Sequence, residues 1–285
     1  MILEETYTLA NGVELPKLGL GTWFIDDDRA AQAVRDAVEL GYRLIDTAQA
    51  YGNERGVGEG ARTAGVPREQ LFVASKVAAE HKTYEEAAAG IDETLAKMGL
   101  DYLDLMIIHA PQPWAEWRGE RRYFEENRAV WRALEDAYAA GKLRAIGVSN
   151  FLRDDLENLL AACRVRPMVN QVLAHVGNAP HALIDYCHAE GIVVESYSPI
   201  AHGQVLGDER VAALAARYGA TPAQLCVRYA IQLGTAALPK TANPVHMAEN
   251  AAVDFVIGAD DMAALSALRF ADYGQFSRFP VFSGK

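Results

Sequence analysis

Residues 71–109 read LFVASKVAAEHKTYEEAAAGIDETLAKMGLDYLDLMIIH. This stretch has a short apolar run at 71–76, a segment of helical periodicity at 84–98 and a second apolar run at 102–109. Continuous apolar runs are typical of strands that are buried on both faces of a parallel sheet. The stretch therefore predicts a strand, a helix and a second strand parallel to the first.

The same alternation continues along the whole chain. We predict strands at residues 15–21, 42–47, 71–76, 102–109, 143–149, 167–172, 192–197 and 235–240. Helical periodicity lies between them, most clearly at residues 30–40, 84–98, 124–140, 154–162, 180–189 and 222–233. Eight strand–helix units in about 250 residues match the size of a (β/α)8 barrel. We therefore expect an α/β fold in which residues 1–285 form one (β/α)8 TIM barrel domain.

Two segments lie outside the eight units. Residues 6–15, TYTLANGVEL, place Asn11-Gly12 between alternating apolar residues, which predicts an N-terminal β-hairpin that caps the bottom of the barrel. The residues after Phe270, ADYGQFSRFPVFSGK, show no periodicity. We expect them to form a short C-terminal loop with few large side chains to narrow the barrel mouth.

Composition and charge exclude several classes of partner. The chain has 27 Lys and Arg against 38 Asp and Glu, which gives a net charge of −11. Nucleic acids and anionic membranes require a basic surface, so we expect neither as a partner. No apolar run approaches the roughly 20 residues of a membrane span, and the N-terminus lacks the order of a signal peptide. The three cysteines contain no C-x-x-C pair, which favours free thiols in the cytoplasm and no metal site.

Polar or aromatic side chains stand at the end of every predicted strand. In a (β/α)8 barrel the active site lies at the carboxyl ends of the strands. The residues there are Trp23, Asp46 with nearby Tyr51, Lys76, His109, Ser149 with Asn150, Gln171, Tyr197, and Lys240 with Thr241. A set that covers all eight strands indicates a functional site at the barrel mouth.

The motifs around these residues resemble those of a known family. Those that carry catalytic positions are GYRLIDTAQAYGNE (41–54), ASKV (74–77) and LMIIHAP (105–111). Those that carry cofactor positions are GKLRAIGVSNF (141–151), VNQ (169–171), ESYSPI (195–200) and LPKTANPVHMAEN (238–250). Over essentially its full length the chain resembles the aldo-keto reductases, and among them most closely the bacterial reductases of 2,5-diketo-D-gluconate.

The resemblance implies that Tyr51, Asp46, Lys76 and His109 are catalytic. Tyr51 would be the general acid that protonates a carbonyl oxygen as hydride arrives. We expect Lys76 to lower the pKa of Tyr51 from its usual value near 10, and Asp46 to hold Lys76 in an ion pair. His109 would hydrogen-bond the carbonyl oxygen. Taken singly, each residue also fits a structural role, such as a core histidine or a buried ion pair.

The resemblance also implies a nicotinamide cofactor, with NADPH favoured and NADH left open. Ser149, Asn150 and Gln171 would bind the carboxamide, and Tyr197 would stack on the ring. Further cofactor contacts are expected from Thr22, Ser198, Pro199, Ile200, Lys240, Thr241, His246, Glu249 and Asn250. His246 stands where the family usually has an arginine, which should weaken the preference for the 2′-phosphate of NADPH.

The expected substrate is a small carbonyl compound, 2,5-diketo-D-gluconate or a reactive aldehyde. Trp23, His109, Ala110 and Trp114 are the candidate substrate residues. Ala110 stands where the family usually has a tryptophan, which should widen the pocket. The family also implies a monomer.

Two other functions fit parts of the sequence. A cofactor-binding sensor or regulatory subunit would keep the nucleotide residues and show little turnover. A Schiff-base aldolase would use Lys76 and leave Tyr197 and Lys240 unexplained. The segment GVGEGA (56–61) matches G-x-G-x-x-A but falls inside a predicted helix, so we do not interpret it as a dinucleotide-binding loop.

Overall fold

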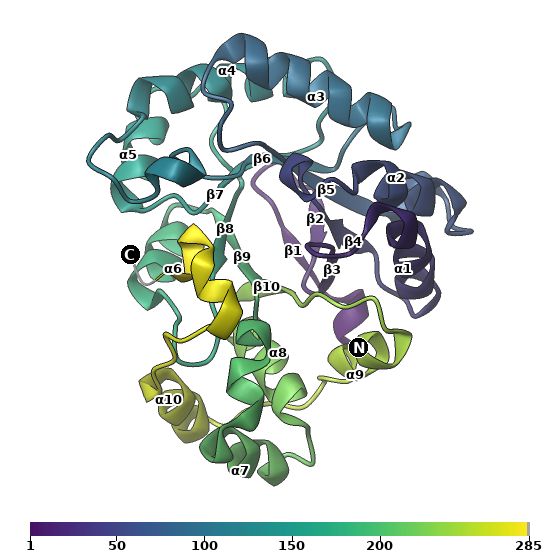
Figure 1. Ribbon diagram of the computed structural model, residues 1–285, viewed down its shortest axis with the longest axis vertical. Helices are drawn as coiled ribbons and strands as arrows, with labels where there is room; N and C mark the ends of the chain where they lie inside the picture. Colours follow the sequence, from purple (N-terminus) through teal and green to yellow (C-terminus); the bar gives the residue numbers. More distant parts are fainter. Residues whose placement is uncertain (284–285) are drawn as a thin grey trace.

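Eight parallel strands form the centre of the computed structural model, which describes residues 1–283 (Figure 1). They lie side by side in chain order from β3 to β10. Their bounds are β3 Gly19–Gly21, β4 Leu44–Asp46, β5 Phe72–Val77, β6 Leu105–Ile108, β7 Ile146–Ser149, β8 Val169–Leu173, β9 Val193–Tyr197 and β10 Thr235–Leu238. This order of parallel strands confirms the predicted (β/α)8 architecture.

The first and last strands meet and close the barrel. The Gly21 amide donates to the Pro239 carbonyl over 3.1 Å, and the Ala237 amide donates to the Lys17 carbonyl over 2.8 Å. Parallel bridges join Leu18 to Ala237 and Gly21 to Lys240. Closure removes the free sheet edges and brings residue 240 beside the first strand.

Helices surround the barrel. Their bounds are α1 Asp27–Glu39, α2 Glu54–Thr63, α3 Tyr84–Met98, α4 Phe124–Ala139, α5 Arg153–Leu160, α6 His181–Ala189, α7 Glu209–Arg217, α8 Pro222–Gln232, α9 Pro244–Ala251 and α10 Ala259–Ala267. Sequence periodicity missed α7, α9 and α10, and in α10 only Leu265 is buried, so this helix has no apolar stripe to detect. Within residues 1–283 no helix is long and apolar enough to cross a membrane.

The glycine-rich segment 56–61 lies inside α2, as predicted. A Cβ atom on Gly58 would lie 2.3 Å from the backbone of Met98 at the end of α3. The glycine is therefore required by close helix packing and has no connection with a phosphate loop.

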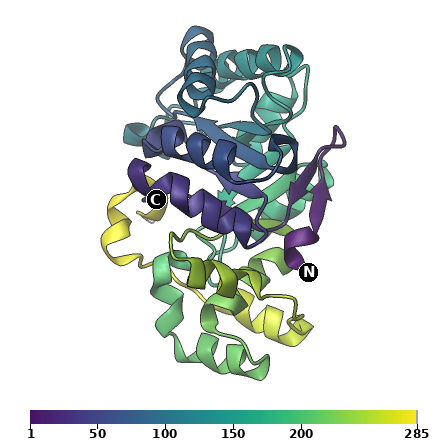
Figure 2. The same cartoon turned by 90° about the vertical axis from the view of Figure 1, so that its right-hand side faces the viewer.

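The N-terminal hairpin pairs β1, Thr6–Thr8, with β2, Glu14–Pro16 (Figure 2). Gly12 has φ +84°, and the Leu9 amide donates to the Val13 carbonyl over 2.8 Å, so the turn forms where it was predicted. Leu9 packs in the same buried cluster as inward-facing strand residues, which places the hairpin against the barrel interior. The single strand predicted at 15–21 is wrong, because Leu15 and Pro16 pair in the hairpin, while Leu18 and Gly19–Gly21 pair within the barrel.

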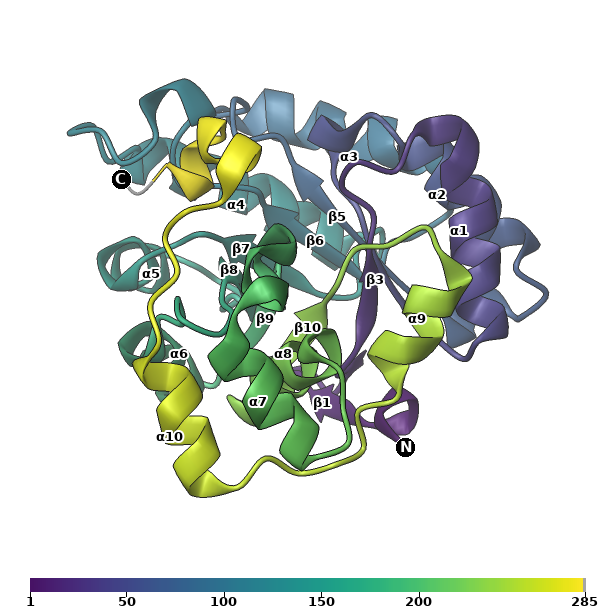
Figure 3. The same ribbon diagram turned by 60° about the horizontal axis from the view of Figure 1, so that its bottom comes forward.

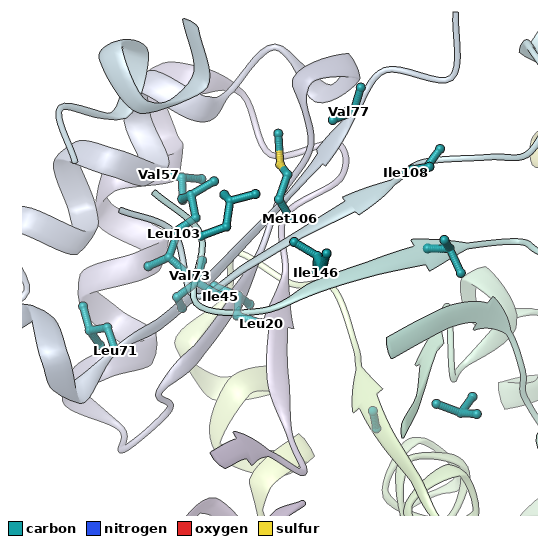
Figure 4. Packing of buried hydrophobic residues seen from close by; sticks show 14 of the residues in the cluster. Leu20, Ile45, Val57, Leu71, Val73, Val77, Leu103, Met106, Ile108 and Ile146 are labelled. Atoms are coloured by element: carbon teal, nitrogen blue, oxygen red, sulfur yellow. The ribbon is translucent and has the colours of Figure 1, made fainter. Parts of the chain in front are cut away.

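Alternation along each strand separates two layers of side chains. Ile45, Val73 and Met106 pack outward against the helices, and Figure 4 shows this outer layer. Asp46 directly follows Ile45, and Lys76 lies three positions after Val73, so both point into the barrel, since successive strand residues face opposite sides. This alternation places the polar side chains at the strand ends inside the barrel mouth.

The C-terminal tail, predicted as a loop, contains regular structure. It forms two short 3₁₀ helices, Gly274–Arg278 and Pro280–Phe282, and runs from α10 back toward the α4 side of the barrel (Figure 3). Tyr273 anchors it, because its hydroxyl lies 2.8 Å from Nε2 of His175. Phe282 is only 1% exposed.

Candidate active site

A cavity of about 780 Å³ opens at the carboxyl ends of the strands. Most predicted site residues line it: Thr22, Trp23, Asp46, Tyr51, His109, Trp114, Ser149, Asn150, Gln171, Tyr197, Ser198, Pro199, Ile200, Lys240 and His246. Lys76 lies behind this wall, 1% exposed. The size fits the range of about 300–1,000 Å³ that is typical of small-molecule sites.

Asp46 and Lys76 form a buried ion pair at the ends of β4 and β5. Nζ of Lys76 donates to Oδ1 and Oδ2 of Asp46 over 2.6 and 2.7 Å. It donates its third hydrogen bond to the Thr47 carbonyl over 2.7 Å. Since all three ammonium hydrogens have partners, the pair is fully satisfied and rigid.

Tyr51 lies beside this pair on the short helix Gln49–Tyr51 that follows β4. Nζ of Lys76 is 5.0 Å from the centre of its ring. Burial, and secondarily the Asp46 carboxylate, hold the pKa of Tyr51 well above 10. The predicted net lowering of this pKa by Lys76 is therefore wrong, because burial and the Asp46 charge disfavour the phenolate more than the nearby ammonium group favours it.

His109 follows β6 and faces Tyr51 across the cavity, with the two ring centres 5.6 Å apart. Burial, and secondarily the charge of Lys76, hold its pKa well below 6.5, so the imidazole is neutral. Its Nδ1 is enclosed without a hydrogen-bond partner within the described chain. A neutral imidazole with a hydrogen on Nε2 offers one donor to the cavity.

Ser149, Asn150 and Tyr197 form one hydrogen-bonded group. The Tyr197 hydroxyl donates to Oδ1 of Asn150 over 2.8 Å. Nδ2 of Asn150 donates to Oγ of Ser149 over 2.9 Å and to the His109 carbonyl over 3.1 Å. Asn150 has φ +61°, a conformation that asparagine tolerates better than most residues. The network fixes the ring of Tyr197 in the cavity wall.

Gln171 on β8 connects two carboxyl groups. Its Nε2 donates to Oδ1 of Asp46 over 2.9 Å and to Oε2 of Glu195 over 2.8 Å. Thr22 also contacts this side of the cavity and donates through Oγ1 to the Asp46 carbonyl over 2.9 Å. Sequence analysis missed Glu195, although it stands two residues before Tyr197 and so shares its side of β9.

Basic residues lie at another part of the cavity wall. Lys240 and His246 both line it. Burial, and secondarily the charge of Arg29, lower the pKa of Lys240. Arg29 on α1 is thus a further cation near Lys240 that sequence analysis did not consider.

Besides Lys76, four predicted residues do not border the cavity: Ala110, Thr241, Glu249 and Asn250. Oγ1 of Thr241 accepts from the Asn243 amide over 3.0 Å in the turn before α9, and Glu249 is exposed on that helix. Asn250 is 4% exposed. Their cofactor roles remain predictions.

Ala110 is buried, and its carbonyl accepts from Nζ of Lys82 over 2.9 Å. Trp114, four residues later, packs edge-on against His109 with ring centres 5.1 Å apart. The cavity therefore has an aromatic wall beside His109 even without a tryptophan at position 110.

The tail supplies a second aromatic wall. Phe276, Phe279 and Phe282 line the cavity, so the expectation that the tail has few large side chains at the mouth is wrong. The Phe276 ring stacks on His202 with centres 4.0 Å apart, and Phe279 packs edge-on against Trp23 at 5.1 Å. The three-residue spacing of these phenylalanines matches the period of a 3₁₀ helix. This spacing could have predicted from the sequence that the three rings lie on one face.

Comparisons with known proteins agree with this geometry. The model of the Aldo/keto reductase family matches residues 17–269. The chain is 41% identical over 268 residues to a glyoxal reductase of Bacillus subtilis strain 168, which covers 93% of each protein. It is 39% identical over 274 residues to a morphine 6-dehydrogenase of Pseudomonas putida, with 91% of this chain and 90% of that protein covered.

A solved structure shows the same relationship. The crystal structure of an aldo/keto reductase from Brucella melitensis matches with a TM-score of 0.85 and 33% identity, over 92% of this chain and 98% of that one. The family match spans all eight barrel strands and the strand-end residues that line the cavity. The protein is therefore an NAD(P)H-dependent oxidoreductase that acts on carbonyl groups. The chain belongs to the aldo/keto reductase family.

Proposed function

We propose that this enzyme is an NADPH-dependent reductase that transfers hydride from nicotinamide to an aldehyde or ketone, with Tyr51 as the general acid. The observation that carries the proposal is the meeting of Tyr51 and His109 in one cavity beside the buried Asp46–Lys76 pair. A phenol and a neutral imidazole that face the same space can both contact one carbonyl oxygen.

The residues of the cavity fit a nicotinamide dinucleotide. Amide and hydroxyl groups of Ser149, Asn150 and Gln171 gather on one part of the wall, and the basic residues Lys240 and His246 lie on another. The first set suits a carboxamide and the second suits a phosphate. When bound, the cofactor supplies a hydride to the carbonyl carbon.

The chain's own residues would then orient and protonate the substrate. His109, as a neutral donor, holds the carbonyl oxygen, and Tyr51 gives that oxygen its proton. The high pKa of Tyr51 keeps the phenol protonated at neutral pH. Transfer remains favourable, because the alkoxide formed by hydride addition is a strong base, comparable to hydroxide, and is more basic than a phenolate. Lys76 lies close enough to stabilise the resulting phenolate.

The aromatic walls of the cavity indicate which class of substrate it favours. Trp23, Trp114 and Phe279 line the cavity near the catalytic residues. Such walls favour aldehydes and ketones with planar or apolar substituents, since these bury more apolar surface than a polyhydroxylated sugar acid. A small dicarbonyl is also a candidate substrate, because one relative is a glyoxal reductase. Reduction of 2,5-diketo-D-gluconate remains a prediction.

The test is absorbance at 340 nm with purified protein, methylglyoxal, an aromatic aldehyde and 2,5-diketo-D-gluconate, each with NADPH and with NADH. We expect NADPH oxidation, fastest with the aromatic aldehyde. Tight NADPH binding without oxidation would instead indicate a cofactor sensor. Trapping of a substrate on Lys76 by borohydride, without any need for NADPH, would indicate a Schiff-base aldolase.

A further inference from the structure

Glu195 is a fully buried acid that the catalytic steps above do not use. It lies on β9 and is 0% exposed. It does not border the cavity, but Gln171, which does, separates it from Asp46. Burial of a charged carboxyl group costs free energy unless the charge is paired. A carboxyl group so deep in the barrel therefore indicates a specific role.

The contacts of Glu195 define the orientation of the Gln171 amide. Nε2 of Gln171 has two hydrogens and directs one at Asp46 over 2.9 Å and one at Glu195 over 2.8 Å. The amide oxygen must then point away from both carboxyl groups. Since Gln171 lines the cavity, and nothing within residues 1–283 donates to this oxygen, it is free to accept a hydrogen bond from a ligand.

The charge state of Glu195 follows from its neighbours. The charged groups that face it are Asp46 on β4 and Lys76 on β5, while β8 and β10 bring the uncharged Gln171 and Ala236 beside it. Lys76 has no hydrogen left to donate, because all three go to Asp46 and Thr47.

Oε1 of Glu195 is therefore enclosed without a partner in the described chain. Burial, and secondarily the Asp46 charge, raise the pKa of Glu195 to about 7. The acid is thus largely neutral in mildly acidic solution and gains a negative charge as the pH rises through neutrality.

We propose that Glu195 is a positioning residue: its carboxyl group holds the Gln171 amide with the oxygen toward the cofactor carboxamide. Ionisation of this same group adds a negative charge behind the nicotinamide site. That charge favours the oxidised cofactor, whose ring is positive, over the reduced cofactor, whose ring is neutral. The inference rests on the proposed function, since it assumes that the nicotinamide lies next to Gln171.

Two variants separate the role of the hydrogen bond between Gln171 and residue 195 from the role of the charge on Glu195. Glu195→Gln keeps an acceptor for Gln171 and cannot ionise, whereas Glu195→Leu removes the acceptor. Dissociation constants for NADPH and NADP⁺ are measured by quenching of tryptophan fluorescence between pH 6 and 8.5. At pH 6 we expect wild type and Glu195→Gln to bind NADPH alike, and Glu195→Leu to bind it roughly tenfold more weakly, as expected when a buried hydrogen bond is lost.

The pH series gives a readout that a purely structural role would not change. In wild type the ratio of the NADP⁺ to the NADPH dissociation constant should fall roughly three- to tenfold from pH 6 to 8.5, and in Glu195→Gln it should stay constant. Both cofactors carry the same phosphates, so titration of these phosphates changes the two dissociation constants alike and leaves their ratio unchanged. Burial keeps the pKa values of His109 well below this range and of Tyr51 well above it.

Ser196→Ala is the matched control, because Ser196 is an equally buried polar residue on β9 that bonds outward to Thr235 over 2.7 Å. It should leave both constants unchanged. Equal NADPH binding by folded Glu195→Leu and wild type, or a ratio in Glu195→Gln that falls as in wild type, would overturn the inference. Absence of NADPH oxidation by the wild-type enzyme would instead count against the proposed function.

Discussion

The ammonium group of Lys76 lies 5.0 Å from the centre of the Tyr51 ring, yet its hydrogen bonds go to Asp46 and Thr47. Lys76 is thus near enough to favour a phenolate, but this attraction does not offset the burial and the Asp46 charge that keep Tyr51 protonated in the free enzyme. The arrangement favours a tyrosine that stays protonated until a stronger base, the alkoxide, forms beside it.

Replacing Tyr51 by phenylalanine tests the general acid directly. We expect Tyr51→Phe to bind NADPH with nearly unchanged affinity and to lose about 10²–10⁴-fold in kcat, the usual contribution of a positioned acid. Fluorescence titration gives the affinity, and absorbance at 340 nm gives kcat. A variant with wild-type turnover would rule out Tyr51 as the acid.

The buried ion pair should be essential for stability. Lys76→Met leaves the Asp46 carboxylate buried without its partner and should cost about 3–5 kcal/mol of the free energy of unfolding. Urea denaturation measures this loss. Arg153→Met is the control, because it breaks only surface contacts, the ion pair with Glu157 and the packing over the Tyr186 ring, and should change the urea midpoint little. Equal midpoints for the two variants would contradict a tightly coupled buried pair.

The basic end of the cavity should decide between NADPH and NADH. Lys240→Ala should weaken NADPH binding roughly tenfold and leave NADH binding nearly unchanged, because only NADPH carries the 2′-phosphate. His246→Arg should strengthen NADPH binding, since arginine is always charged and binds phosphate with two donors. Parallel titrations with both cofactors provide the check, and an equal loss of both in Lys240→Ala would refute the assignment.

Acid should lower the stability of the fold through His175, which holds the C-terminal tail. Burial lowers the pKa of His175 to about 4, compared with about 6.5 in the unfolded chain. The folded state therefore binds fewer protons than the unfolded state between these values, so the contribution of His175 to stability is present above pH 6.5 and is lost as the pH falls toward 4. The loss should amount to about 3 kcal/mol over this window.

His175→Gln removes the titration and retains a polar partner for Tyr273. The difference in unfolding free energy between wild type and this variant should change between pH 6.5 and pH 4.5, as measured by urea denaturation at each pH. A difference that is independent of pH would show that His175 does not titrate with unfolding.

Much of the fold and of the candidate site follows from local sequence patterns. The apolar runs and helical segments predicted eight units in the observed order, because a strand buried on both faces must be apolar and a covering helix needs one apolar side. Strand parity then places Asp46, Lys76 and His109 at one mouth once the barrel closes. Helix α10 escaped prediction because only Leu265 of its residues is buried.

Contacts between distant segments could not be predicted in this way. The hydrogen bond between Gln171 and Asp46 joins residues 125 positions apart, and it depends on the strand register of the closed barrel. The placement of Phe276 on His202 depends on where the tail is anchored. The high pKa of Tyr51 reflects its burial and the nearby Asp46 charge. The order of units and the identities of the strand-end residues are thus local properties of the chain, whereas register, tail packing and electrostatics arise only when distant segments meet.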